Sequence, residues 1–143
     1  MICNFQKQFV ERVKLGKKDC TIREVRNGKK RWRKGMVIQC QTGSRYKSVR
    51  FLVAEVLEVA DVEIDAANHE TVKVDGILIP HQLTKRLAVM DGFLDVQDFM
   101  DYFYPKVEDP ITGPEPFKGQ WIIFGPKALA LLNEIRSLNK EAQ

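Results

Sequence analysis

The chain has 143 residues, of which 44% are hydrophobic and 29% charged, and its formal net charge is +4. This length suits one domain of ordinary globular composition, and no apolar run reaches the roughly 18 residues of a membrane-spanning helix. The first residues lack an apolar core of signal-peptide length, so we expect a cytoplasmic protein. The three cysteines are widely spaced and the two histidines lie far from them, so we expect no metal ion, other cofactor or disulfide framework.

The N-terminal third is predicted to hold one helix and two strands. Asn4 can cap the helix, an apolar stripe then recurs at four-residue spacing, and Gly16 ends it. The stripe consists of Phe5, Phe9 and Val13. Two short strands follow at 21–25 and 36–41, with a polar loop over 26–35 between them.

The middle of the chain is predicted to be mostly strand. Residues 48–59 are rich in valine on both faces, as in a strand that crosses the core of a barrel, and 62–64 continue the pattern. Asp75-Gly76 supplies the positive φ angles of a tight turn, which predicts a hairpin between 71–74 and 77–79.

The C-terminal part is predicted to combine helices with one strong strand. Asp91-Gly92-Phe93 ends a helix, and Asp95 can cap the next one. The expected elements are helices over 81–90 and after Asp95, a proline-rich loop over 105–116, a strand over 120–124 and a final helix from Pro126. Together the elements predict a small α+β domain whose sheet closes into a barrel with short flanking helices.

Positive charge is concentrated in one part of the chain. Residues 11–50 hold fourteen Lys and Arg against three acids, a net charge of +11, so the other residues carry −7. Six of the nine residues 26–34 are basic, and one is Trp32. Cations neutralise phosphates and an aromatic ring can stack on a base, so the stretch favours RNA or a nucleotide as partner. The alternative is a solvated loop that serves solubility.

The corner between the first helix and the first strand holds the sharpest candidate site. Lys18 could act as a base if burial or neighbouring cations lower its pKa, and the Thr21 hydroxyl could then act as nucleophile. Arg23 alternates with Thr21 along the strand, so both side chains point to one face and Arg23 could contact a phosphate or carboxylate. The simpler interpretations are a surface lysine, a β-forming threonine and an arginine in an ion pair. Asp91, taken alone, is a turn carboxylate.

Two loops are predicted to add contacts to an anion. The turn at Thr42-Gly43 offers hydroxyls, backbone amides and cations that could surround a phosphate. Trp32, flanked by two arginines, is expected to be exposed and functional. The predicted ligand- and phosphate-binding residues are Lys17, Arg23, Arg31, Trp32, Arg33, Thr42, Gly43, Arg45 and Lys47.

Taken together, these segments resemble the ASCH family, small proteins with a β-barrel related to the PUA RNA-binding domain, in the layout of members encoded by phages and prophages. The matching pieces are the opening helix, Gly16-Lys17-Lys18-Asp19-Cys20-Thr21-Ile22-Arg23, Lys34-Gly35-Met36-Val37-Ile38, Thr42-Gly43-Ser44-Arg45, the valine-rich strand, Asp91-Gly92-Phe93 and Trp121-Ile122-Ile123-Phe124. The resemblance implies an ASCH/PUA-like domain over 1–125, with a helical extension over 126–143 packed on it.

The resemblance also implies that the cleft between barrel and helices binds RNA or a nucleoside. Some members hydrolyse the amide of acylated cytidine, such as N(4)-acetylcytidine, with a lysine, a threonine and a glutamate. These match Lys18, Thr21 and Asp91, the last one methylene shorter, and Asp19 stands where a threonine is usual. The first hypothesis is therefore an RNA- or nucleotide-binding protein, and the second is an amidohydrolase. A ribonuclease, as in another branch of the family, or a protein-interaction module is the third.

Overall fold

The computed structural model describes residues 2–6, 9–10, 13, 18–25, 28–43, 49–105 and 114–141, and in them the chain has an α+β fold. The strands are β1 (Ile2–Asn4), β2 (Cys20–Glu24), β3 (Val37–Thr42), β4 (Val49–Glu55), β5 (Glu58–Asp65), β6 (Thr71–Val74), β7 (Ile77–Leu78) and β8 (Phe117–Ile123). The helices with described bounds are α2 (His81–Met90), α3 (Val96–Tyr102) and α4 (Pro126–Glu141).

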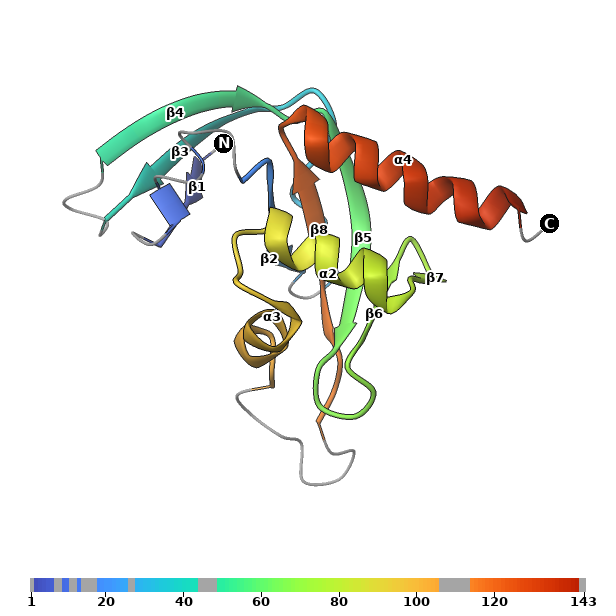
Figure 1. Cartoon of the computed structure of the whole chain (residues 1–143). Helices are drawn as coiled ribbons and strands as arrows, with labels where there is room; N and C mark the ends of the chain where they lie inside the picture. The colour runs from blue at the N-terminus through green and yellow to red at the C-terminus, as the bar shows by residue number, and fades with distance from the viewer. Residues whose placement is uncertain are drawn as a thin grey trace.

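The strands form two sheets. A three-stranded sheet has the order β1-β3-β4, with β1 parallel to β3, and an antiparallel five-stranded sheet has the order β2-β8-β5-β6-β7. Figure 1 shows the smaller sheet at one end of the larger one. β8 is paired on both sides, which suits the apolar run Trp121-Ile122-Ile123, all of it buried.

The chain passes from one sheet to the other at Val56-Leu57. The Val56 N–H donates to the Met36 carbonyl at 2.8 Å, whereas the Leu57 N–H donates to the Ile123 carbonyl at 2.7 Å, in the larger sheet. The single strand predicted over 48–59 is therefore wrong, since this stretch comprises β4 and the start of β5. The described strands form two separate sheets, and neither closes on itself, so they do not make the predicted barrel.

The N-terminus begins with a strand where we predicted a helix cap. Asn4 ends β1 and pairs in register with Gln41 of β3, so it does not cap a helix. Of the helix predicted next, the structure describes residues 9, 10 and 13 as helical, whereas Phe5, the first residue of the predicted stripe, is not helical. Phe9 and Val13 are helical and buried there, as the apolar stripe predicted.

Three local predictions are confirmed. Asp75 and Gly76 have φ angles of 50° and 80° and connect β6 to β7. The Asp95 carboxylate accepts a hydrogen bond from the Asp98 N–H at 2.8 Å and so caps α3. Pro126 is the first residue of α4, where its missing N–H costs no helical hydrogen bond.

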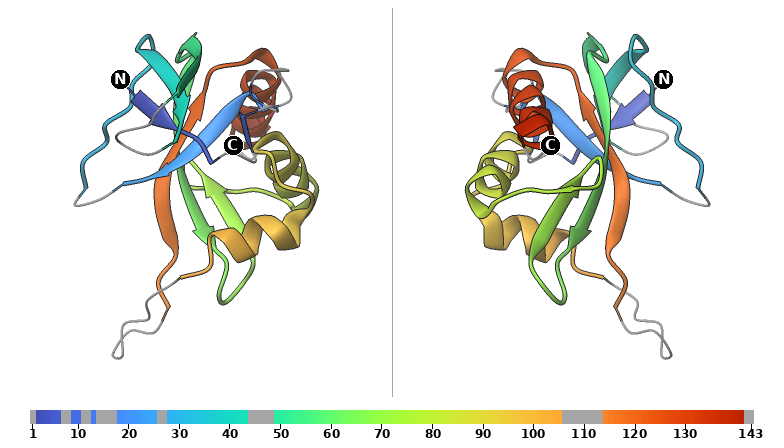
Figure 2. Two further views of the ribbon diagram at one scale, coloured as in Figure 1. Left: turned by 90° about the vertical axis from the view of Figure 1, so that its left-hand side faces the viewer. Right: turned by 90° about the vertical axis from the view of Figure 1, so that its right-hand side faces the viewer.

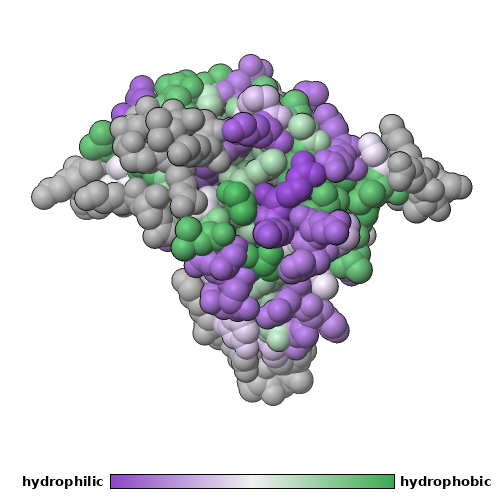
Figure 3. Space-filling model, in the orientation of Figure 1, coloured by the Kyte–Doolittle hydropathy of each residue, from purple (hydrophilic) through white to green (hydrophobic). Residues whose placement is uncertain are grey.

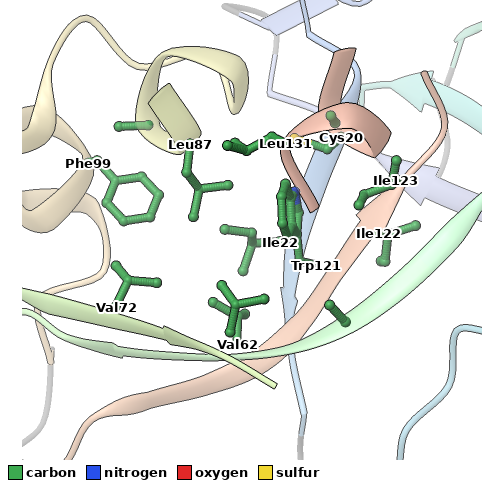
Figure 4. Packing of buried hydrophobic residues seen from close by; sticks show 14 of the residues in the cluster. Cys20, Ile22, Val62, Val72, Leu87, Phe99, Trp121, Ile122, Ile123 and Leu131 are labelled. Carbon is green, nitrogen blue, oxygen red and sulfur yellow. The ribbon is translucent and has the colours of Figure 1, made fainter. Parts of the chain in front are cut away.

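The helices α2, α3 and α4 cover one face of the five-stranded sheet, and α2 packs against both others (Figures 1 and 2). Figure 4 shows the core between them, in which Trp121 of β8 lies among side chains from the sheet and the helices. Its labelled members are Cys20, Ile22, Val62, Val72, Leu87, Phe99, Trp121, Ile122, Ile123 and Leu131.

The outer surface over α2 and α3 is mostly hydrophilic, with small hydrophobic areas between the charged groups (Figure 3). Leu94, in the connection between these helices, is 77% exposed. Neither these helices nor any other in the described residues combines the length and apolar character needed to cross a bilayer.

Candidate functional site

A cleft of about 510 Å³ lies between the N-terminal segment, β2 and the connection from α2 to α3. This volume is within the usual range for small-molecule sites, roughly 300–1,000 Å³. Its lining consists of Asn4, Phe5, Gln6, Phe9, Lys18, Thr21, Ile22, Arg23, Thr42, Gly43, Asp91, Phe93, Tyr102 and Phe103. The structure therefore brings the three predicted catalytic residues to one cleft, together with three of the predicted ligand contacts.

Lys18 and Asp91 form a buried ion pair in this cleft. The Lys18 ammonium lies 2.5 Å from Asp91 Oδ1 and 2.5 Å from the Asp91 carbonyl oxygen, and the two side chains are 3% and 4% exposed. The same ammonium lies 4.9 Å from the centre of the Phe9 ring and 5.9 Å from that of Phe5. Two oxygens and two ring faces thus replace the water that a buried cation loses.

The end of α2 positions Asp91. The Asp91 N–H donates to the Leu87 carbonyl at 2.9 Å and the Phe93 N–H to the Ala88 carbonyl at 3.0 Å, which ends the helix. Gly92 between them has a φ of 97°, and a Cβ there would lie 2.9 Å from Phe9 Cδ1. Asp91-Gly92-Phe93 therefore needs its glycine both for the backbone turn and for the close approach of the Phe9 ring.

Burial raises the pKa of the Asp91 carboxyl, and the neighbouring Lys18 ammonium offsets part of that rise. The carboxyl consequently takes up a proton at a higher pH than an exposed aspartate. Because its Oδ1 contacts the Lys18 amine directly, a proton can pass between the two groups without an intervening water. A carboxyl with a shifted pKa in a cleft is typical of catalytic and binding sites.

β2 carries Thr21 and Arg23 to the same cleft, which confirms that they share a face. Thr21 is buried, and among the described residues none hydrogen-bonds its hydroxyl. The Arg23 guanidinium lies 5.2 Å from the centre of the Phe5 ring, and its Nη2 donates to the Asn4 carbonyl oxygen. Arg23 therefore bridges β2 and β1 and adds a positive charge to the cleft wall.

Asp19 has a structural role that the sequence did not reveal. Its Oδ2 accepts a hydrogen bond from the Lys127 N–H at 2.8 Å, in the first turn of α4, and its carbonyl accepts one from the Phe124 N–H at 2.9 Å. A Cβ on Gly125 would lie 2.3 Å from Asp19 Cγ, so this carboxylate needs a glycine beside it. Asp19 thus fastens the segment that carries Lys18 to the C-terminal helix.

Trp32 and its flanking arginines do not line the cleft. The Trp32 side chain is partly buried and packs against the core, so our prediction of an exposed ring is wrong. The core is apolar, and a large indole that packs against it loses much of its water-exposed area. Arg31 and Arg33 are exposed, as expected for cations that meet a ligand or solvent. Of the other predicted contacts, Lys17, Arg45 and Lys47 lie outside the described residues.

The aromatic wall of the cleft was missed. Phe93 lies between Phe9 and Tyr102, with ring centres 5.7 Å and 5.2 Å away, and Phe103 completes the wall. The sequence predicted the helix after Asp95, but not that its end borders a cleft. The signal was present in the sequence, because four aromatic residues fall within 99–104.

The cysteines are buried, and burial raises the pKa of Cys20 and of Cys40 to about 12, so their thiols are poor nucleophiles. In the part of the chain that the structure describes, no group of three or more His, Cys, Asp and Glu could hold a metal ion. Among the residues that line the cleft, Lys18 supplies an amine, Asp91 a carboxyl, Arg23 a guanidinium, and Thr21 and Thr42 hydroxyls.

Comparisons with protein-family models, curated proteins and solved structures found no match to this chain. The resemblance to the ASCH family therefore stays a prediction from the sequence motifs.

Proposed function

We propose that the chain is an RNA- or nucleotide-binding protein of the ASCH type, with its ligand in the cleft beside Lys18. The observation that carries the proposal is the composition of the cleft: aromatic rings form its walls, while Lys18, Thr21, Arg23 and Asp91 supply its polar groups. A nucleobase is a flat ring with hydrogen-bonding edges, and stacking on an aromatic side chain contributes about 1–3 kcal/mol per base.

The charge distribution supports an anionic ligand. Residues 11–50 carry a net charge of +11, and Arg23 of this stretch lies in the cleft wall. Binding should then weaken as salt rises, with a log–log slope of about −0.7 for each phosphate contacted on a single strand. Binding that does not respond to salt, or no binding at micromolar protein, would contradict the proposal.

A matched pair of tyrosines tests whether the cleft is the binding site. Tyr102 lines the cleft and Tyr104 does not, yet they are 46% and 47% exposed. We expect Tyr102→Ala to weaken the binding of a labelled single-stranded RNA by roughly tenfold, because it removes a stacking surface, and Tyr104→Ala to leave it unchanged. Equal effects of the two substitutions would place the ligand elsewhere.

A second candidate function, hydrolysis of an acylated cytidine, is favoured by the direct contact of Lys18 with Asp91 in the cleft that Thr21 lines. In this reaction the Lys18 ammonium first passes a proton to the Asp91 carboxylate. The neutral Lys18 amine then takes the proton of the Thr21 hydroxyl or of a water, and the oxygen adds to the acyl carbon. The C–N bond breaks and the exocyclic amine leaves with a proton that Asp91 helps to deliver. Water releases the acyl group from Thr21 if an ester forms, so the products are cytidine and a carboxylic acid.

Asp91 is one methylene shorter than the glutamate of the family pattern. The shorter side chain still meets Lys18, since α2 ends directly beside the amine. Its reach toward a substrate is reduced, however, and a displacement of about 1 Å can cost on the order of a hundredfold in rate. Binding without turnover is therefore our first proposal, and catalysis is the second.

Catalysis is tested by following the absorbance of N(4)-acetylcytidine with purified protein. Thr21→Val removes the hydroxyl with little change in shape and should abolish turnover when the Thr21 oxygen, and not a water, is the nucleophile. Thr42→Val removes another hydroxyl of the cleft and should retain turnover in either case. No turnover by the unaltered protein, or turnover that survives both Thr21→Val and Lys18→Ala, would reject the amidohydrolase.

A further inference from the structure

Gln120 is a buried polar residue in the middle of the larger sheet. It is 4% exposed, and its amide forms two hydrogen bonds with the backbone of Trp32. The Trp32 N–H donates to Gln120 Oε1 at 3.1 Å, and Gln120 Nε2 donates to the Trp32 carbonyl at 3.0 Å. This reciprocal pair holds the segment that follows β2 at one defined point.

The attachment point lies next to the cleft. Gln120 of β8 is the register partner of Arg23 of β2, and directly opposite residues of an antiparallel pair project to the same face with Cβ atoms about 4.5–5.5 Å apart. Arg23 lines the cleft, so Gln120 binds Trp32 one side chain away from the cleft wall. The left view of Figure 2 shows β2 crossing this side of the molecule, with the segment 28–36 along one margin and α3 along the other.

The segment presents positive charge at this point. Trp32 packs inward, and the arginines on either side of it, Arg31 and Arg33, are exposed. Residues 28–36 contain no acid, and Lys30 alone among their cations has a described carboxylate partner, Asp61. The inward tryptophan and the Gln120 amide therefore fix the backbone, while the guanidinium groups stay available to an anion.

We propose that Gln120 is a positioning residue that holds a phosphate-binding loop, residues 29–34, beside the cleft, and that the ligand is therefore a single-stranded oligonucleotide. One base occupies the cleft, and the phosphates of neighbouring nucleotides contact Arg31 and Arg33. This inference rests on the proposed binding function and narrows its ligand from any nucleotide to a nucleotide within a strand.

The test compares a nucleoside monophosphate with single-stranded RNA and DNA of increasing length, by calorimetry and fluorescence anisotropy at several salt concentrations. For the unaltered protein we expect affinity to rise with length. Arg31→Gln combined with Arg33→Gln should reduce the salt slope for the strand by about 1.4, since each lost phosphate contact removes about 0.7. Affinity for the monophosphate should stay unchanged. Lys85→Gln, which removes one exposed cation from α2, is the control for a general change of charge.

Gln120→Leu tests the positioning role. It removes both hydrogen bonds to Trp32 while keeping a side chain of similar volume, and we expect roughly tenfold weaker strand binding with monophosphate binding unchanged. Equal loss for strand and monophosphate would show a general structural role and overturn the assignment of Gln120. The exposed arginine pair keeps the inference testable even if Gln120→Leu does not fold.

The outcomes separate the two proposals. Binding of neither monophosphate nor strand would contradict the proposed function itself. Binding of both with the same affinity and the same salt slope would leave that function standing and overturn the inference. If only RNA shows length-dependent binding, the site also recognises the 2′-hydroxyl group. If DNA binds equally well, the site recognises phosphate and base alone. Both outcomes support a strand as ligand.

Discussion

Two lysine–aspartate pairs in this molecule differ greatly in how far they are buried. Lys18 and Asp91 are 2.5 Å apart with side chains 3% and 4% exposed, whereas Lys30 and Asp61 are 2.9 Å apart with side chains 58% and 55% exposed. An exposed pair contributes about 0–1 kcal/mol, because water and salt screen it. A buried pair first has to give up its hydration, and that cost can exceed the attraction.

The comparison indicates why each pair is present. The exposed pair links residues 28–36 to β5 and changes the free energy of unfolding little. The buried pair is a poor way to gain stability, yet it places an amine and a carboxyl of raised pKa inside a cleft. That arrangement suits a binding or catalytic site, where groups are kept ready for a ligand.

The largest effect should follow from breaking the buried pair. Lys18→Met leaves the Asp91 carboxylate buried without a cation and should lower the free energy of unfolding by about 3–5 kcal/mol near neutral pH. The substitution raises the pKa of Asp91 further above its ordinary value of 3.8, so the loss is small at acid pH and grows as pH rises through that raised pKa. Urea denaturation across pH measures it, and a loss independent of pH would contradict the assignment to Asp91.

Gly92→Ala should have the next largest effect, because it disturbs the turn that presents Asp91. We expect a loss of about 2–4 kcal/mol, from the φ of 97° and from a Cβ placed 2.9 Å from Phe9 Cδ1 and 3.4 Å from Lys18 Cδ. The matched control is Gly76→Ala, whose φ is 80° and whose Cβ would meet nothing within 4 Å. Equal melting temperatures for the two variants would show that crowding at the buried pair contributes nothing.

Asp19→Ala should lower the free energy of unfolding by less, since it removes a hydrogen bond next to Lys18 and leaves the Lys18–Asp91 pair intact. Loss of the hydrogen bond to the Lys127 N–H should cost about 0.5–2 kcal/mol, the usual range for a helix cap. Asp19→Asn keeps an acceptor at the same place and should restore most of the stability in thermal unfolding. A full loss in Asp19→Asn would show that the negative charge, and not the hydrogen bond, matters.

The smallest effect should come from the exposed pair. Lys30→Met should change the free energy of unfolding by less than about 1 kcal/mol, and the change should shrink further as salt is raised. Denaturation at low and high salt checks this. A loss comparable to that of Lys18→Met would show that burial does not distinguish the two pairs.

Several elements of the fold could be predicted because their signals are local. Asp75-Gly76 predicts a hairpin through its backbone conformation. Asp95 predicts a helix start through a side-chain hydrogen bond, and Pro126 predicts another through its fixed φ angle. The helix over 81–90 was predicted with the bounds of α2 for the same reason, since Pro80 precedes it and Gly92 follows it.

Other elements could not be predicted, because they depend on partners far along the chain. Residues 48–59 show an unbroken strand pattern, and only the separate hydrogen bonds of Val56 and Leu57 divide them between two sheets. β1 is a three-residue strand that exists through its pairing with β3. Trp32 has an arginine on each side, which predicted an exposed ring, but the ring is partly buried because it packs against the apolar core.

The sequence by itself placed Lys18, Thr21 and Arg23 at one corner of the chain, because they are close together in it. Asp91 was added to them only by the resemblance to the ASCH family. Only the tertiary structure decided that Lys18 and Asp91, which are 73 positions apart, share one buried contact and that aromatic rings enclose it. Burial is a property of the packed molecule. It raises the pKa of Asp91, shields the contact with Lys18 from water and salt, and distinguishes this pair from the exposed pair of Lys30 and Asp61.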